Sequence, residues 1–275
     1  MSYATMMVPL ALGVSNAEPL KVAADIAARF GAGILGVTAC ERLSLTYGGA
    51  YLSGEVFERI QDQTEKLARE AEAEFRALLS PHVKQLEWRC AETYEPLYDY
   101  FARQARSADL IVSAGETGPM LHRASSFGTS DIVMRAGRPV LLVPPGSDRM
   151  RLDRVLIGWK ETREARRAVS DALPLLRMAQ HVVLAEIAPV DRLPEARGHL
   201  ADVAHWLGRH GVAAETIASA AEGPDVDSLA KVAKDHGADV IVAGAYGHSR
   251  FHEWALGGVT RDLLLSTRRF AFLSH

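Results

Sequence analysis

Short apolar runs alternate along the whole chain with longer stretches of mixed polarity. The run 140–143 is apolar at every position, as a strand buried on both faces of a sheet must be. Segments such as 18–30 and 56–79 instead space their apolar residues as a helix does. Strands that alternate with helices predict a parallel sheet covered by helices on both faces.

In the first half of the chain this pattern predicts strands at 4–10, 34–38, 86–91, 110–114 and 139–143, and helices at 18–30, 56–79, 96–107 and 129–136. The same order of elements recurs from Arg154 to the C-terminus. The pattern therefore predicts two similar α/β units.

An internal repeat supports this division. The segment 108–112 (ADLIV) recurs as 238–242 (ADVIV), and each copy precedes a glycine-bearing turn. The first half is longer, and its extra residues include 44–54, whose Gly, Ser and Tyr content predicts a loop. Pro and Gly in 144–148 break the pattern, so we expect domains at 1–147 and 152–275.

Composition narrows the classes of function. The 275 residues carry 31 Lys and Arg against 34 Asp and Glu, a net charge of -3, which argues against a nucleic-acid-binding surface. With 48% hydrophobic residues, the chain can bury a core, so disorder is not expected.

The N-terminal residues, the lengths of the apolar stretches and the two cysteines indicate the location of the protein and the state of its thiols. The first residues do not resemble a secretion signal, and no apolar stretch reaches the roughly 18 residues of a membrane span, so we expect a cytoplasmic protein that contacts no membrane. Cys40 and Cys90 are too few for a disulfide framework, and we expect both to be buried free thiols.

Glycines mark a candidate anion site in the second half. Gly244 and Gly247 follow the predicted strand, and after nine further residues Gly257 and Gly258 precede the expected start of a helix. Glycine lets the backbone approach an anion closely, and a helix start presents free N–H groups.

The repeat, the Ala-Asp-x-Ile-Val strand and the G-x2-G-x9-G spacing together resemble the universal stress protein family in its tandem two-domain form, over essentially the whole chain. The resemblance implies two doubly wound domains of the adenine nucleotide alpha hydrolase-like type, each with a five-stranded, mostly parallel sheet. It also implies that the last strands, 139–143 and 270–274, pair or pack together as a pseudo-dimer within the chain. A further homodimer would be in keeping with the family.

The resemblance further implies an adenine nucleotide such as ATP, with magnesium left open. Nucleotide-binding members hold the phosphates on the glycine loop, place Ser or Thr after its last glycine, and use an Asp after the first strand. The implied nucleotide-binding residues of the second half are Gly244, Gly247, Gly257, Gly258, Val259, Thr260, Trp159 and Lys160.

The second half departs from this pattern at two positions. Gly258 stands where the family has a hydroxyl, although Thr260 follows closely, and Lys160 replaces the Asp. Lys160 either meets a phosphate or points to solvent. Trp159 either stacks on the base or packs in the core.

The first half departs differently. Its literal match to the glycine pattern comprises Gly115, Gly118, Gly128 and Thr129. If the helix register of the family is kept, however, Ser126 takes the place of the last glycine. Ala11 also stands where the Asp should be, and a methyl group cannot accept a hydrogen bond.

Other chemistry has weaker signals. His248 and His252 are four residues apart beside Glu253, but we expect exposed polar residues there and no metal site. Arg250 either contacts a phosphate or is solvated. No nucleophile motif and no Walker loop is present, so we expect no enzyme and no catalytic residue.

Three hypotheses of function remain. The protein is a nucleotide-binding member of the stress response, or a nucleotide-independent interaction or protective module with degenerate pockets, or a weak ATPase. The sequence leaves open which half, if either, binds nucleotide.

Overall fold

The computed structural model describes residues 2–42, 46–47, 50–51, 53–115, 128–221, 225–245 and 269–275. The first half contains β1 (Thr5–Pro9), α1 (Ala17–Phe30), β2 (Gly33–Glu41), β3 (Thr46–Tyr47), β4 (Ala50–Tyr51), α2 (Gly54–Leu79), β5 (Leu86–Thr93), α3 (Leu97–Gln104), β6 (Leu110–Ala114), α4 (Thr129–Arg135) and β7 (Val140–Val143). The second half contains β8 (Arg154–Trp159), α5 (Arg163–Leu176), β9 (His181–Ala188), α6 (Leu193–Arg209), β10 (Ala214–Ala220), α7 (Asp225–Asp235), β11 (Val240–Gly244) and β12 (Phe270–Ser274).

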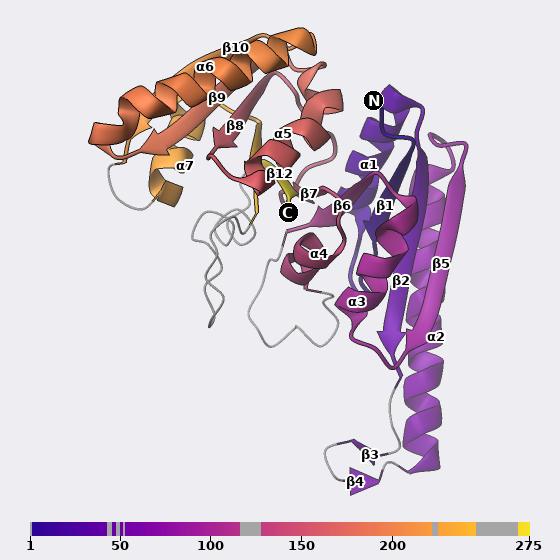
Figure 1. Cartoon of the computed structure of the whole chain (residues 1–275). Helices are drawn as coiled ribbons and strands as arrows, with labels where there is room; N and C mark the ends of the chain where they lie inside the picture. The colour runs from indigo at the N-terminus through magenta and orange to yellow at the C-terminus, as the bar shows by residue number, and fades with distance from the viewer. Residues whose placement is uncertain are drawn as a thin grey trace.

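A single ten-stranded sheet runs through both halves in the order β10-β9-β8-β11-β12-β7-β6-β1-β2-β5 (Figure 1). Within each half the five strands are parallel and share one order: third, second, first, fourth, fifth. The predicted fold class, two five-stranded α/β units in tandem, is confirmed. The proposed domain limits at residues 147 and 152 stay a prediction.

The two halves meet where β7 pairs with β12, and this pair is antiparallel. Phe272 lies opposite Leu141, and both are fully buried. The pairing expected between 139–143 and 270–274 is therefore present. It extends the hydrogen-bonded sheet without interruption from one half into the other.

Helices cover both faces of the sheet. On one face, α1, α2, α5 and α6 enclose a hydrophobic core that continues across both halves. On the other face, α3 and α4 cover the first half, and α7 covers part of the second. No helix in the described part of the chain combines the length and apolar character that crossing a membrane would require.

The repeated Ala-Asp segment has a structural role. Asp109 accepts hydrogen bonds from the backbone N–H groups of Ala4 (2.8 Å) and Thr5 (3.0 Å), which begin the neighbouring strand β1. Its counterpart Asp239 accepts one from the N–H of Arg154 (2.9 Å) at the start of β8. Each Asp therefore ties the first strand of its half to the fourth, which explains a repeat at this position.

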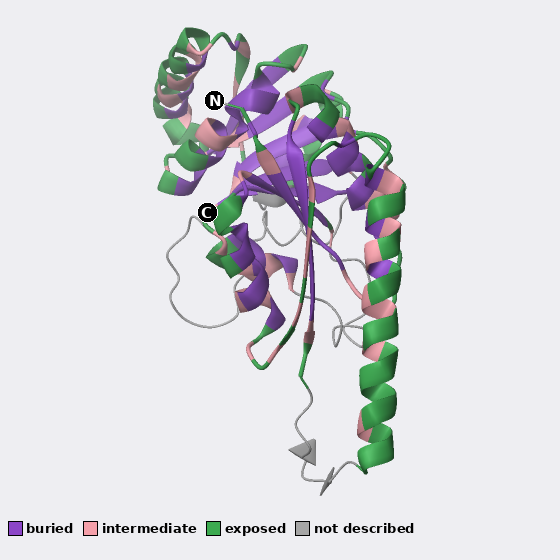
Figure 2. Ribbon diagram, turned by 90° about the vertical axis from the view of Figure 1, so that its right-hand side faces the viewer, coloured by how far each residue is buried: buried purple, intermediate pink, exposed green. Residues whose placement is uncertain are grey.

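Helix α2 extends beyond the body of the molecule (Figure 2). Its buried residues are Ala71, Phe75 and Leu79, all in its C-terminal part. The segment 44–54, predicted as a loop, contains the short antiparallel pair β3 and β4. Strands β2 and β5 are longer than predicted because they pair with each other through Glu41 and Thr93, past the apolar run.

The expected burial of both cysteines is wrong for Cys90. Both thiols are free, but Cys90 is exposed and Cys40 is half-buried. The reason is that β5 is the last strand of the sheet, so it has a partner along one edge alone. Trp206 is likewise exposed on α6.

We expect Phe272→Ala to lower the free energy of unfolding by about 3–5 kcal/mol, because it leaves a cavity at the junction of the halves. Urea denaturation followed by circular dichroism measures the change. Val56→Ala, on the exposed part of α2, is the control and should change stability by less than about 0.5 kcal/mol. Similar effects of the two substitutions would contradict a central role for the junction.

Candidate functional site

The order of strands points to one candidate site in each half. Because the order reverses between the first and fourth strands, a crevice forms outside their carboxyl ends, and ligands of open parallel sheets bind there. In the first half these strands are β1 and β6, and in the second half they are β8 and β11. We refer to the two places as the first-half edge and the second-half edge.

The first-half edge is closed by its own side chains. Asn16 is buried, and its Oδ1 accepts a hydrogen bond from the N–H of Ala11 (2.9 Å) while its Nδ2 donates to the carbonyl of Ala11 (3.0 Å). The carboxylate of Glu74, from α2, accepts from the N–H of Asn16 (3.0 Å) and from the hydroxyl of Ser15 (2.7 Å). The loop after β1 therefore has its polar groups satisfied, and it carries a negative charge.

The described glycine-motif residues of the first half are also engaged. The N–H of Gly115 donates to the carbonyl of Val143 (3.4 Å), next to the β6–β7 ladder. Gly128 caps α4 with a φ of +54°, where a side chain would be strained. Thr129 is buried, and its Oγ1 lies 3.5 Å from the Oγ of Ser113 on β6. Its hydroxyl thus faces the sheet.

The second-half edge is built on close backbone contact. A Cβ placed on Gly244, the last residue of β11, would lie 2.5 Å from the backbone nitrogen of Ala165 and 2.6 Å from the carbonyl carbon of Glu164. Any side chain there would collide with the first turn of α5. Glycine at this position therefore lets α5 begin directly against the end of β11.

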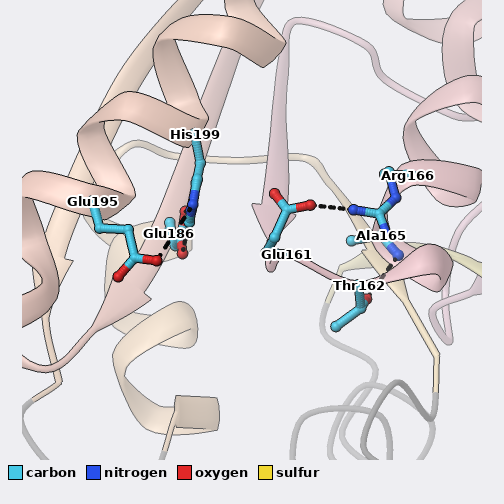
Figure 3. A network of polar contacts seen from close by, with 7 residues as sticks. All are labelled: Glu161, Thr162, Ala165, Arg166, Glu186, Glu195 and His199. Carbon is cyan, nitrogen blue, oxygen red and sulfur yellow. Dashed lines mark hydrogen bonds and ion pairs between the residues drawn. The ribbon is translucent and has the colours of Figure 1, made fainter.

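The start of α5 is already capped. The hydroxyl of Thr162 accepts a hydrogen bond from the N–H of Ala165 (3.2 Å), as Figure 3 shows. Glu164, in the first turn, is buried and is bonded by Arg163. Burial favours the neutral acid, but hydrogen bonds from Arg163 and from its own backbone outweigh burial and lower the pKa of Glu164. A carboxylate in the first turn reduces the positive charge that the helix end offers to an anion, which disfavours a phosphate there.

Trp159, at the end of β8, packs in the hydrophobic core that α5 and α6 cover, which is one of the two roles expected for it. Its Nε1 makes no hydrogen bond to any residue in the described part of the chain. An unsatisfied buried donor costs about 1–3 kcal/mol. An acceptor on a ligand at this edge would remove that cost. Lys160 follows directly and is half-buried.

Next to Trp159 across the sheet lies an acidic residue with a histidine partner. Glu186 of β9 is in register with Trp159, and its carboxylate is 3.3 Å from Nδ1 of His199 on α6. The Nε2 of His199 is 3.9 Å from Glu195 (Figure 3). Burial raises the pKa of Glu186, the nearby charges of Glu161 and Glu195 add to that effect, and His199 opposes it. The pair was not anticipated from sequence, because its members belong to different elements.

Several predicted site residues lie outside the described residues. They are Gly118, Gly247, Gly257, Gly258, Val259 and Thr260, together with Ser126, His248, Arg250, His252 and Glu253. The structure does bring Gly244, Trp159 and Lys160 to the second-half edge, as neighbours at the ends of paired strands β8 and β11. Within the described ranges, no group of three His, Cys, Asp or Glu could hold a metal ion.

Comparison with solved structures identifies the architecture. A universal stress protein from Archaeoglobus fulgidus superposes with a TM-score of 0.73 at 13% identity, covering 98% of this chain and 97% of that chain. A functionally unknown protein from Pseudomonas aeruginosa has a TM-score of 0.60 at 15% identity, covering 99% and 92%. The chain has the fold of a universal stress protein. No model of a protein family matches the sequence, and no curated protein matches it significantly.

The universal stress protein fold extends over both halves, since the Archaeoglobus structure covers nearly the full length of each chain. The resemblance inferred from the repeat is thereby confirmed at the level of the fold. At 13% identity the superposition carries no residue roles across. The chemistry of the two edges therefore has to be argued from this chain's own residues.

We expect Gly244→Ala to lower the free energy of unfolding by about 1–3 kcal/mol, because the added methyl group forces α5 away from β11. The control is Gly198→Ala on α6, where a Cβ would meet nothing within 4 Å. That variant should gain about 0.5–1 kcal/mol from helix propensity. Urea denaturation measures both, and equal stability of the two variants would contradict the close contact.

The raised pKa of Glu186 predicts a pH-dependent effect of Glu186→Gln. The folded protein holds this proton more tightly than the unfolded chain, so ionisation at rising pH costs stability. The variant should gain stability relative to the unmodified protein as the pH rises above the ordinary glutamate pKa of about 4.3. Urea denaturation at a series of pH values from that point upward tests this.

Glu195→Gln is the control, because Glu195 also faces His199 but its side chain is 62% exposed. Its effect should stay within about 0.5 kcal/mol at every pH. A constant difference between Glu186→Gln and the unmodified protein across the range would contradict the assignment.

Proposed function

We propose that the protein binds one adenine nucleotide at the second-half edge, binds none at the first-half edge, and acts without catalysis in a stress response. The observation that carries the proposal is the buried Nε1 of Trp159, at the switch point of the sheet, which has no hydrogen-bond partner among the described residues. The fold supports the place, because open α/β sheets bind ligands at that point.

The residues around Trp159 suit a nucleotide. Lys160 follows it at the end of β8 and supplies a cation within reach of the same edge. Gly244 ends the adjacent strand, and the sequence continues into the glycine pattern 244–258. Because Glu164 disfavours a phosphate at the start of α5, the phosphates are assigned to the glycines at 257 and 258 and to Lys160.

The first-half edge lacks these features. Asn16 occupies both backbone groups of Ala11, and the carboxylate of Glu74 would repel a phosphate. The hydroxyl of Thr129 is directed to Ser113. We therefore assign nucleotide binding to the second half alone.

A non-catalytic role fits the groups at the second-half edge. A general base or nucleophile needs a second group that activates it. Glu186 is joined to His199, but neither lies beside a Ser, Cys or Thr in the contacts of the described residues. Nucleotide binding would then act as a signal, because the fraction of protein in the bound form rises with the nucleotide concentration.

Isothermal calorimetry with ATP, ADP and AMP tests the proposal. We expect one site per chain. Trp159→Phe removes the N–H but keeps the ring, and it should weaken binding about tenfold, since one hydrogen bond contributes about 0.5–1.5 kcal/mol and the ring shifts slightly. Lys160→Met should weaken the binding of ATP more than the binding of AMP. The matched controls Trp206→Phe and Lys66→Met, both far from the edge, should bind as the unmodified protein does.

Three results would overturn the proposal. No binding at millimolar nucleotide would favour the nucleotide-independent module. Two equal sites per chain would show that the first half also binds. ATP hydrolysis that disappears in Gly257→Asp would establish the weak ATPase, whereas hydrolysis that persists would identify a contaminant.

A further inference from the structure

A shallow surface pocket, largely open to solvent and referred to here as the cavity, lies where the chain passes from the first half to the second. Its volume is about 430 Å³, and it is bordered by the end of α1, the connecting segment 149–153 and the residues that follow α5. Its lining includes three guanidinium groups, those of Arg29, Arg149 and Arg151, and one carboxylate, that of Asp153. The cavity is at the amino ends of β8 and β9, away from the second-half edge.

Exposed and buried residues alternate along the connecting segment, and its two arginines are at exposed positions. Met150 and Leu152 are buried in the core, whereas Arg149, Arg151 and Asp153 are exposed. The N–H of Met150 donates to Asp25 (3.1 Å), and its carbonyl accepts from Nη2 of Arg29 (2.6 Å). The backbone of Met150 therefore anchors the segment on α1. The exposed residues on either side of Met150 line the cavity.

The second half fixes the other end of the segment. The N–H of Gln180 donates to the carbonyl of Leu152 (3.1 Å), and the side-chain Nε2 of Gln180 donates to Oδ1 of Asp153 (3.0 Å). Gln180 and Met178 also line the cavity. The walls consequently belong to both halves of the molecule.

The charges of the cavity do not balance. Arg29 is paired with Asp25 at 2.7 Å through its Nη2, the nitrogen that also bonds Met150. Asp153 is engaged by Gln180. Arg149 and Arg151 make no ion pair or hydrogen bond with any residue that the structure describes. With the carboxylates of Asp25 and Asp153 counted against the three guanidinium groups, one positive charge remains in excess, and a bound anion would be attracted to it.

We propose that this cavity binds a small phosphorylated anion with at least two adjacent phosphate groups. The planar fork of arginine matches phosphate oxygens bidentately, and a volume of this size accommodates a small ligand. Arg149 and Arg151 hold the phosphates, Arg29 adds charge from the first half, and Gln180 borders the ligand from the second. The bound anion fastens the two halves together, because its contacts come from both.

Inorganic pyrophosphate is the probe, measured by calorimetry and by the thermal unfolding midpoint at low salt. The unmodified protein should bind it, and the midpoint should rise with its concentration. Arg149→Gln combined with Arg151→Gln should weaken binding at least about tenfold and abolish the rise. The matched control, Arg59→Gln with Arg197→Gln, removes the same charge from exposed positions on α2 and α6 and should bind normally.

A second double variant separates the contribution of positive charge from that of guanidinium geometry. Arg149→Lys with Arg151→Lys keeps the charge but loses the fork, and it should bind pyrophosphate with intermediate affinity. Lys160→Met, at the second-half edge, tells the two places apart: pyrophosphate binding that is lost in Lys160→Met but kept in Arg149→Gln with Arg151→Gln would place the pyrophosphate at the second-half edge and overturn the proposal. Comparing pyrophosphate with a sugar diphosphate then tells whether an organic group adds affinity.

The proposal is overturned if pyrophosphate fails to bind at millimolar concentration, or if the Arg149→Gln and Arg151→Gln variant binds as the unmodified protein does. It is also overturned if the control pair weakens binding equally, since the effect would then come from net charge. Unfolding of each variant without ligand shows whether it is folded, and the Lys pair remains the test if the Gln pair is not.

Discussion

The antiparallel pairing of β7 with β12 is the interaction on which the rest of the structure depends, because it converts two open sheets into one. Each half would otherwise expose its fifth strand, and an unpaired strand of apolar residues is prone to association. Pairing buries Leu141 and Phe272 completely and leaves β5 and β10 as the outer strands. These two are the least buried strands of the ten-stranded sheet in the described structure, which accounts for the exposure of Cys90. The edges that remain unpaired are thus those of the two least buried strands, and both carry polar residues, such as Glu87 in β5 and Glu215 in β10.

The two halves share a backbone but differ in what occupies their switch points. After β1, Asn16 bonds both polar groups of Ala11 and closes the loop upon itself. After β8, Thr162 caps α5 and Lys160 follows the strand, while the indole N–H of Trp159 has no partner in the part of the chain that the structure describes. The same fold therefore provides one edge whose polar groups bond one another, and one edge with an indole N–H that has no partner among the described residues. A duplicated unit can change in this way because the sheet and its Asp109 and Asp239 contacts stabilise each half irrespective of the loop.

Sequence periodicity predicted the strands best where both faces are buried. Strand 110–114 and the start of α4 at residue 129 agree with the structure, because continuous apolar runs and a glycine cap are local signals. Strands β2 and β5 continue further than their apolar runs, since pairing through Glu41 depends on a partner elsewhere in the chain. The glycine pattern did locate Gly244, but the closure of the first-half edge by Asn16 and Glu74 needs a contact between residues 58 apart. The pairing of Glu186 with His199 is a long-range contact of the same kind, between a strand and a helix.

Helix α5 links the two places where we expect ligands. Its first turn lies against Gly244 at the second-half edge, and its last turn precedes Met178 and Gln180, which border the cavity at the connecting segment. In its middle, Asp171 accepts from the hydroxyl of Ser274 (3.0 Å), and its carbonyl accepts from Tyr3 of the first half (2.8 Å). A helix fixed at both ends and in the middle leaves little freedom for movement relative to the sheet. If binding at one of these places shifts α5, the two ligands are coupled, and each must then change the affinity of the other by the same factor.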